Sequence, residues 1–250
     1  MRLSVSRINC FLEDPRKYWY IYEMGIETPK SEGFYFGSAV HAGLEQYYLK
    51  KDPMQGVAQA LFGKKDSLKE QPNDKIDLHK LYTQSRKIFD IYPKQAPKYN
   101  PLFVEKWFEI DLIHPLTKEQ LPVKFAGKMD LITVEGDVID HKTAGGKSNG
   151  YFDDSNFIQA TGYAYAYLTM FGKLPRKFVF NQIIKGNSKR EPSFEEKVLS
   201  PTIEDICKFI DTCKDVAIKI SKGETKDFPS EKHKRVCPCK DICPYCNGEL

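Results

Sequence analysis

Residues 127–142 read Gly127-Lys-Met-Asp130-Leu-Ile-Thr-Val-Glu-Gly136-Asp-Val138-Ile-Asp140-His-Lys142. Two apolar runs flank a Gly-Asp pair, which is a strong signal for a β-hairpin with its turn at residues 136–137. Each run carries an aspartate, Asp130 in the first strand and Asp140 in the second. Because the strands of a hairpin lie side by side, we expect the two carboxylates to converge at one end of a sheet.

Lys142 follows Asp140 by two residues and emerges on the same face of the strand, because side chains alternate with period two. Two neighbouring carboxylates repel each other and are usually held by a cation, and hard oxygen ligands favour Mg²⁺ or Mn²⁺. Such an ion activates water for phosphodiester hydrolysis, and a lysine beside it can orient that water or stabilise developing charge. The hairpin therefore predicts a metal-dependent phosphodiester hydrolase centred on Asp130, Asp140 and Lys142.

An acidic residue two positions before a lysine is weak evidence by itself, since Glu195-Glu-Lys197 and Glu224-Thr-Lys226 match as well. Asp140-His-Lys142 differs because an apolar strand precedes it and a second strand, ending in Gly-x-x-Asp, lies ten residues upstream. The alternative interpretation is a surface hairpin that carries these charges by chance.

The rest of the chain is expected to supply several helices and the other strands of one sheet. Runs rich in β-branched and aromatic residues predict strands at residues 103–112, 123–134, 138–142 and 177–184. Helices are expected from an N-cap at Ser6 through Leu12, from Pro15 onward, and over residues 37–50, 53–68, 76–92, 157–171 and 203–222. The Tyr-Ala-Tyr-Ala-Tyr run inside 157–171 alternates like a strand, but its length and the closing Gly172 favour a helix.

The composition fits one sizeable core. The chain has 250 residues and a net charge of +4, which is too small by itself to indicate a polyanionic partner. Residues 1–10 lack an apolar run behind a basic start, and no window approaches the roughly 18 apolar residues of a membrane span. These features predict a soluble cytoplasmic protein.

A basic stretch stands out locally. Residues 155–190 contain no Asp or Glu, whereas six basic residues fall there: Lys173, Arg176, Lys177, Lys185, Lys189 and Arg190. Such a stretch can follow a phosphate backbone, but a solvated basic face explains it equally well.

Seven cysteines indicate metal or cluster chemistry rather than disulfides in an intracellular chain. Four of them lie near the end of the chain: Cys237, Cys239, Cys243 and Cys246. This Pro-containing tail has little apolar surface to bury them, and tetrahedral sulfur coordination suits Zn²⁺ or an iron-sulfur cluster. Cys207 and Cys213 fall inside the expected last helix, which favours buried small hydrophobes.

The chain resembles RecB-like nucleases of the PD-(D/E)XK superfamily, including CRISPR adaptation nucleases and many phage exonucleases. Five pieces occur in the order seen there: Ser4-Val-Ser-Arg-Ile-Asn with Pro15-Arg-Lys-Tyr, Gly37-Ser-Ala-Val-His41, Gly127-Lys-Met-Asp130, Asp140-His-Lys142, and Gln159 with Tyr163. The resemblance spans nearly the whole chain. It implies an α/β fold with a restriction-endonuclease-like mixed sheet flanked by helices.

By that resemblance, the metal ligands are His41, Asp130, Asp140 and the backbone carbonyl of His141. A lone histidine on a helix is otherwise more often a surface or core residue, so the family pattern carries this expectation for His41. Glu105, in the strand expected at 103–112, is a candidate extra acidic ligand, although an exposed strand glutamate explains it equally well.

The resemblance also implies a role for Gln159 and Tyr163 in positioning Lys142 or the DNA strand near the metal. These two residues lie four apart and so share a helix face. Aromatic packing against the sheet is the alternative, and we prefer it for Tyr165 and Tyr167.

Many RecB-like nucleases carry a 4Fe-4S iron-sulfur cluster that joins an N-terminal cysteine to three near the C-terminus, and the resemblance implies such a staple. The usual N-terminal cysteine directly precedes the Pro-Arg-Lys segment, where this chain has Asp14, and Cys10 lies one helical turn earlier. The tail spacing, with one, three and two residues between successive cysteines, also differs. Two ligand sets stay open, all four tail cysteines or Cys10 with three of them. The metal is then a 4Fe-4S cluster or Zn²⁺, and a tail without metal is the remaining interpretation.

We therefore predict one nuclease unit over residues 1–250, with a mainly helical lobe (1–100), a catalytic sheet and helix (101–200), and a C-terminal helix and Cys-rich tail (201–250). The expected activity is Mg²⁺- or Mn²⁺-dependent hydrolysis of DNA, as a single-strand exonuclease in recombination, repair or CRISPR adaptation in a phage or prokaryote. Any helicase is expected to be a partner, because no Walker-type glycine loop is present. The rival hypotheses are a catalytically silent module that binds single-stranded nucleic acid, and a zinc-binding interaction protein organised around the tail.

Overall fold

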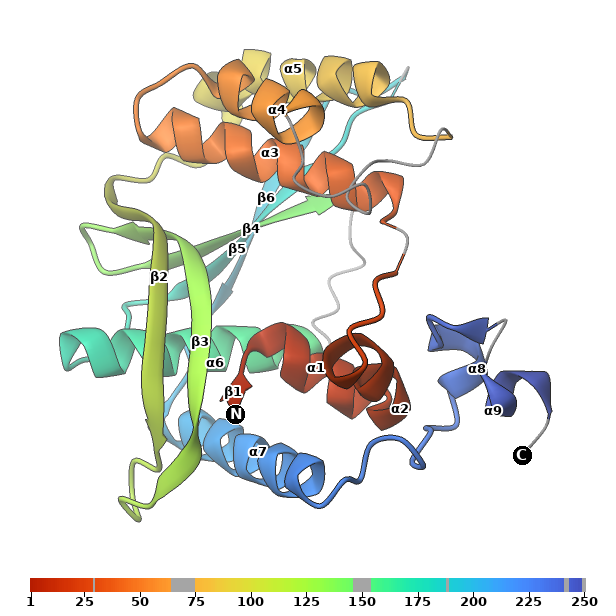
Figure 1. Ribbon diagram of the computed structural model, residues 1–250. Helices are drawn as coiled ribbons and strands as arrows, with labels where there is room; N and C mark the ends of the chain where they lie inside the picture. The colour runs from red at the N-terminus through yellow and green to blue at the C-terminus, as the bar shows by residue number, and fades with distance from the viewer. Residues whose placement is uncertain (29, 64–74, 146–153, 188, 241–242, 249–250) are drawn as a thin grey trace.

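A computed structural model describes residues 1–28, 30–63, 75–145, 154–187, 189–240 and 243–248 (Figure 1). In chain order the elements are β1 (Arg2–Leu3), α1 (Val5–Glu13), α2 (Pro15–Tyr18), the π-helix η1 (Trp19–Glu23), α3 (Glu32–Tyr48), α4 (Pro53–Phe62), α5 (Leu78–Gln95), β2 (Pro101–Ile113), β3 (Gln120–Thr133), β4 (Val138–Ala144), α6 (Asp154–Phe171), β5 (Phe178–Ile184), β6 (Ser193–Leu199), α7 (Ile203–Ser221), α8 (His233–Val236) and α9 (Pro244–Asn247). Within these residues, none of the helices combines the length and apolar character that crossing a membrane requires.

Six strands of the described chain form one mixed sheet. The long strands β2 and β3 pair antiparallel, β3 turns back into β4, and β5 lies parallel to β4 and antiparallel to β6. The short strand β1 pairs in parallel with β3. A parallel pair needs a crossover connection, and α6 supplies it between β4 and β5. The predicted mixed α/β sheet flanked by helices is confirmed.

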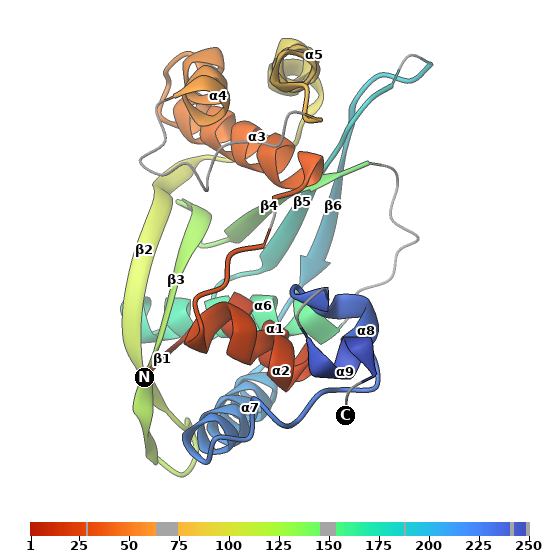
Figure 2. The same cartoon turned by 45° about the vertical axis from the view of Figure 1, so that its right-hand side comes forward.

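Helices cover both faces of the sheet, as the two views in Figures 1 and 2 show. Along β5, Phe178 and Phe180 belong to the core that contains α6 and α7, whereas Val179 and Ile183 belong to the core that contains α3, α4 and α5. The period-two alternation of a strand sorts its side chains into these two cores. This explains why β5 is apolar at nearly every position.

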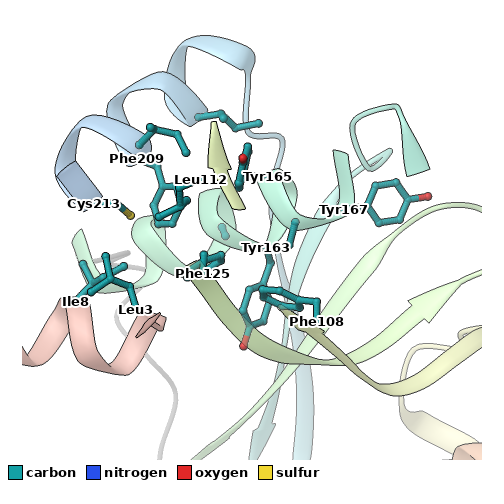
Figure 3. Close-up of a cluster of buried hydrophobic side chains, with 14 of the residues drawn as sticks. Leu3, Ile8, Phe108, Leu112, Phe125, Tyr163, Tyr165, Tyr167, Phe209 and Cys213 are labelled. Carbon is teal, nitrogen blue, oxygen red and sulfur yellow. The ribbon is translucent and has the colours of Figure 1, made fainter. Parts of the chain in front are cut away.

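Aromatic rings fill the centre of the core on the α6 and α7 side (Figure 3). Phe125 of β3 is fully buried, with its ring 5.4 Å from Phe108 and 5.2 Å from Phe209. Because β2, β3 and α7 meet at these rings, the rings pack the long β2–β3 hairpin against α7.

The N-terminal helices begin at slightly different caps from those expected. Ser4, not Ser6, caps α1: its backbone is extended (φ −143°, ψ 164°), and its Oγ accepts a backbone hydrogen bond at 3.3 Å. Ser6 already lies inside the helix, so it cannot be the cap. The second helix does begin at Pro15, with Asp14 as its N-cap.

Other element boundaries also differ. α3 begins after the cap Ser31 rather than at Gly37, because Tyr35 and Phe36 are already buried in the core that contains α3, α4 and α5. The strands β1 and β6 were not predicted: β1 is only two residues long, and the charges of β6 mark an edge strand rather than a buried one. The expected helix 53–68 ends at Phe62, and its residues 64–68 lie outside the described part of the chain.

One glycine of α3 is tightly packed, which leads to a stability prediction. A Cβ at Gly43 would lie 2.4 Å from the ring of Phe89, whereas a Cβ at Gly33 would meet nothing closer than Ser31 Oγ at 3.6 Å. We expect Gly43→Ala to lower the free energy of unfolding by about 1–3 kcal/mol through overpacking. Gly33→Ala should raise it by about 0.5–1 kcal/mol, because alanine restricts the unfolded chain. Urea unfolding measures both; equal effects would contradict the close contact between α3 and α5.

Candidate active site

Two aspartates meet at the β3–β4 hairpin. The pairing of Leu131 with Ile139 puts Asp130 and Asp140 opposite each other on neighbouring strands. Asp140 is 3% exposed, and Asp130 Oδ2 accepts a hydrogen bond from the backbone N–H of His141 at 2.8 Å. The structure thus brings together the two carboxylates that the sequence singled out.

His41 and Glu105 lie next to this pair, and these four side chains (His41, Glu105, Asp130 and Asp140) are called the acidic group below. His41 Nδ1, from α3, lies 3.4 Å from Asp130 Oδ2. On β2, Glu105 lies between Val104, which pairs with Leu131, and Lys106, which pairs with Met129, so Glu105 is opposite Asp130. One ligand atom each of His41, Glu105 and Asp130 lies within 4.8 Å of the others. Glu105 has a left-handed φ of 53°, a costly conformation that concentrates at functional sites. The sequence left the role of Glu105 undecided, and the structure places it beside His41 and Asp130.

The electrostatics of the pair favour a bound cation. Burial and the neighbouring charge of Asp140 raise the pKa of Asp130 to about 7. A divalent ion would relieve this cost, because it stabilises both ionised carboxylates. Burial lowers the pKa of His141 well below its usual value, so this imidazole is neutral. The His141 ring stacks on Tyr48 at 5.7 Å, and its Nδ1 lies 3.0 Å from Asn181. The side chain therefore faces the core that contains α3, α4 and α5.

Lys142 lies on the same strand face as Asp140, as the alternation predicted. Its Nζ is 2.9 Å from Asp140 Oδ2, and 40% of the side chain is exposed. Gln159, from α6, donates a hydrogen bond from Nε2 to Asp140 Oδ1 at 2.7 Å. Gln159 therefore contacts the carboxylate directly, and Lys142 faces both the carboxylate and solvent.

Tyr163 supports the strand that leads into Asp130. Its O–H donates to the carbonyl of Lys128 at 3.0 Å, and its ring packs on Phe108 at 5.8 Å. A Cβ at Gly127 would lie 2.8 Å from Phe108 and 3.4 Å from Tyr163. Glycine at this motif position therefore lets the aromatic rings approach β3 closely.

The other two tyrosines of α6 are packing residues, as expected. Tyr165 is buried, and its O–H donates to the carbonyl of Asp111 at 2.8 Å. Tyr167 is also buried, and its ring lies 4.5 Å from that of Phe171.

A groove beside the acidic group escaped the sequence reasoning. It measures ≈ 340 Å³, and its lining includes Arg2, Arg7, Trp107, Lys128 and Tyr163. Trp107 is 54% exposed, and the guanidinium of Arg2 lies 5.8 Å from its ring. Lys128 also forms an ion pair with Glu105, which links the groove to the acidic group. Strand alternation could have revealed Trp107, since its neighbour Phe108 is a core residue.

The strand β5 divides the basic stretch at residues 155–190. Three of its basic residues precede β5 and three follow it, and the seven residues of β5 span roughly 23 Å. Arg176, before β5, makes two hydrogen bonds of 2.7 Å to Asp137 at the β3–β4 turn. Lys185, after β5, lies 3.5 Å from Glu32 of α3. Both residues therefore pair with carboxylates of the chain itself.

The cysteine-rich tail lies beside α2 (Figure 2). Four side chains place one ligand atom each within 4.8 Å of one another: His233, Cys237, Cys243 and Cys246. Cys239 is buried in the same cluster but outside this set, and Cys10 packs against the core around α6 and α7. The observed group therefore differs from both expected ligand sets, because neither contained His233.

The thiols of this region differ in their protonation. Burial raises the pKa of Cys10 to about 11 and that of Cys237 to about 12. Burial also opposes ionisation of Cys243, yet hydrogen bonds from Tyr20 and His233 lower its pKa to about 5. Sequence could have pointed to His233, since it lies four residues before Cys237, one helical turn away. Cys207 and Cys213 of α7 are buried, as predicted.

The fold is similar to the folds of solved structures. A candidate exonuclease from Eubacterium rectale superposes with a TM-score of 0.59 at 16% sequence identity, over 100% of this chain and 88% of that chain. At this identity the likeness concerns the fold alone. The protein SSO0001 matches with a TM-score of 0.44 at 12% identity, over 98% of this chain and 86% of that chain, which is too distant to support an argument.

The sequence itself matches a family. A search of curated proteins found no significant match. Residues 2–244, however, match the family described as the PD-(D/E)XK nuclease superfamily. This match covers nearly the whole chain, and it includes the β3–β4 hairpin with its two aspartates and lysine. The chain therefore belongs to the PD-(D/E)XK nuclease superfamily.

Proposed function

We propose that the chain is a DNA nuclease that uses Mg²⁺ or Mn²⁺ and removes nucleotides from the end of a single strand. One observation carries the proposal: His41, Asp130, Asp140 and Lys142 gather at the β3–β4 hairpin, with His41 Nδ1 3.4 Å from Asp130 and Lys142 Nζ 2.9 Å from Asp140. Membership of the superfamily supports nuclease activity in general. The DNA preference, the metal and the exonuclease mode are parts of the proposal.

The donor set fits a hard divalent cation. His41 offers one nitrogen, and Glu105 and Asp130 offer carboxylate oxygens, which Mg²⁺ and Mn²⁺ prefer. Asp140, opposite Asp130 on β4, is proposed to add a further carboxylate oxygen. The raised pKa of Asp130, caused by burial and by Asp140, supports the same conclusion, because an added positive charge favours the ionised pair. When bound, the cation supplies positive charge to the phosphate and lowers the pKa of a coordinated water. The backbone carbonyl of His141 is proposed as a further ligand.

The protein side chains hold and complete this centre. Gln159 donates to Asp140 Oδ1 and so fixes the carboxylate, while Oδ2 faces Lys142. The ammonium of Lys142 is partly exposed, and it can donate to a phosphate oxygen or orient the attacking water. Tyr163 supports β3 next to Asp130 through its hydrogen bond to the Lys128 carbonyl. Lys142 is thus proposed as the catalytic residue, and Gln159 and Tyr163 as positioning residues.

The groove beside the centre supports a single strand as the substrate. Arg2, Arg7 and Lys128 offer positive charge to a phosphate backbone, and the exposed ring of Trp107 offers a surface on which a base can stack. A duplex buries its base faces, so an exposed indole beside basic side chains suits unpaired nucleotides better.

Trp107 provides a test of the groove as the binding site of the single strand. We expect Trp107→Ala to weaken the binding of an oligothymidine strand by about 5- to 150-fold, because base stacking on an aromatic ring is worth about 1–3 kcal/mol. Trp107→Phe should retain most of the affinity. Fluorescence anisotropy in Ca²⁺, with Phe228→Ala as a control for an exposed aromatic residue outside the groove, measures the effect. Unchanged affinity in Trp107→Ala would mean that the strand takes another route.

The exonuclease mode is tested with linear and circular DNA. Linear single strands labelled at the 5′ or 3′ end, and a circular single strand of the same length, are incubated with Mg²⁺ or Mn²⁺. The proposal expects mononucleotide or short products from linear strands only, and the label that is released first reveals the polarity. Cleavage of the circle would replace the exonuclease mode with an endonuclease, and binding without cleavage would favour the silent binding module.

The wider setting of the nuclease also forms part of the proposal. We assign the chain to the RecB-like branch and treat residues 1–250 as one nuclease unit. A role in recombination, repair or CRISPR adaptation follows from this branch, with unwinding supplied by a separate helicase.

A further inference from the structure

A buried hydrogen-bonded chain connects the N-terminal helices to the C-terminal tail. Asp14 is fully buried, and its Oδ1 lies 2.9 Å from Nδ1 of His233. On the other side of the same ring, Nε2 of His233 lies 3.2 Å from Sγ of Cys243. The carboxylate therefore orients the imidazole so that Nε2 is directed at the cysteines.

Asp14 is held in place from both ends of the chain. It accepts hydrogen bonds from the backbone N–H of Lys17 at 2.5 Å, where it caps α2, and from N and Oγ of Ser230 at 2.8 Å each. A carboxylate behind a histidine is the usual support of a metal-bound imidazole, because it fixes the tautomer and raises the basicity of the other nitrogen. No such carboxylate is needed for a histidine that only fills space.

The spacing of the donors fits a single ion. One ligand atom each of His233, Cys237, Cys243 and Cys246 lie within 4.8 Å of one another. Around one tetrahedral Zn²⁺, with Zn–S of about 2.3 Å and Zn–N of about 2.0–2.1 Å, neighbouring ligand atoms are roughly 3.5–3.8 Å apart. In a four-iron cluster each thiolate binds a different iron, so the ligand atoms stand farther apart.

We propose that His233, Cys237, Cys243 and Cys246 bind one Zn²⁺, with Asp14 as the positioning residue behind His233. Three thiolates around Zn²⁺ leave a net negative charge, and the buried guanidinium of Arg16 contacts Cys243 and offsets it. Cys239 and Cys10 take no part. The centre needs no cysteine in the N-terminal helices, because the Asp14–His233 pair connects them to the metal.

The proposed centre is structural. It fastens α2 to α8 and α9, which lie side by side in Figure 2. The helix α1 directly precedes α2, and its first residues line the groove that contains Trp107. Zinc at this position therefore stabilises one wall of the groove without contacting the acidic group.

The first test measures metal content and zinc-edge X-ray absorption of the full chain purified anaerobically. The proposal expects one zinc per chain, with three sulfurs at about 2.3 Å and one nitrogen at about 2.0–2.1 Å. Stoichiometric iron and acid-labile sulfide, a shell of four sulfurs, or a purified protein that does not take up Zn²⁺ would each overturn it. This test requires no variant to fold and no nuclease activity.

Variants then identify the ligands. Zinc should be lost in Cys243→Ser and kept in Cys239→Ser and Cys10→Ser. Asp14→Asn, which retains an oxygen acceptor, should weaken zinc affinity by about 10- to 100-fold, as measured against a chelator. Full zinc affinity in both Asp14→Asn and His233→Ala would contradict the role of the pair.

Discussion

Lys142→Met is expected to reduce the rate of DNA cleavage by about 100- to 10,000-fold while leaving DNA binding almost unchanged. Methionine keeps the length of the side chain but removes the ammonium, which lies 2.9 Å from Asp140 and is partly exposed toward the proposed phosphate position. Because the charge is needed most where negative charge develops in the transition state, kcat should fall and KM should change little. Single-turnover cleavage of end-labelled DNA in Mn²⁺ measures the effect.

Lys197→Met is the matched control, because Glu195-Glu-Lys197 repeats the same acidic-x-lysine spacing on β6. It removes the same charge from the edge strand β6, which β5 separates from β4. Cleavage should then stay within about twofold of the wild type, as expected for a change outside the active site. If both variants cleave DNA at the wild-type rate, Lys142 is not the catalytic lysine.

Asp140→Asn is expected to have opposite effects on activity and stability. Cleavage should fall by about 1,000-fold or more, since a charged metal ligand is lost. The metal-free protein, however, should gain about 0.5–2 kcal/mol in its free energy of unfolding, because the repulsion between Asp140 and Asp130 disappears. The new amide oxygen can still accept from Gln159, and Lys142 is exposed enough for water to replace its ion pair.

Urea unfolding in EDTA and again in Mn²⁺ measures the change in the free energy of unfolding without and with metal. In EDTA the variant should be more stable than the wild type, and Mn²⁺ should stabilise the wild type more. Asp111→Asn serves as a control, because Asp111 is an exposed carboxylate of β2 paired with Lys124 at 3.4 Å. Its effect should stay below about 1 kcal/mol. A destabilised Asp140→Asn protein in EDTA would show that the carboxylates do not repel each other.

The parts of the site that could be predicted from sequence are local. The hairpin turn at Gly136 and the period-two relation between Asp140 and Lys142 depend only on residues close in the chain, and both are present. Local cues set cap positions less well, since Ser4 and Ser6 are equally good cap residues and only the backbone path selects Ser4.

The parts that could not be predicted depend on distant pairing. The sequence named Glu105 as a candidate ligand but left it undecided, because Glu105 joins the acidic group only through the register of β2 on β3. Asp14 and His233 are 219 residues apart, so their contact is invisible until the tail folds back on α2. Cys10 was a candidate ligand only through the family resemblance, and in the structure it packs against the core around α6 and α7.

We assign metal-dependent cleavage to the acidic group at the β3–β4 hairpin. Single-turnover cleavage of an end-labelled single DNA strand by the wild type and by Asp130→Asn, each in Mn²⁺ and in EDTA, tests this assignment. We predict cleavage by the wild type in Mn²⁺ alone, and no cleavage by a variant that still folds and binds the strand. Cleavage by Asp130→Asn at the wild-type rate, or by the wild type in EDTA, would contradict the claim.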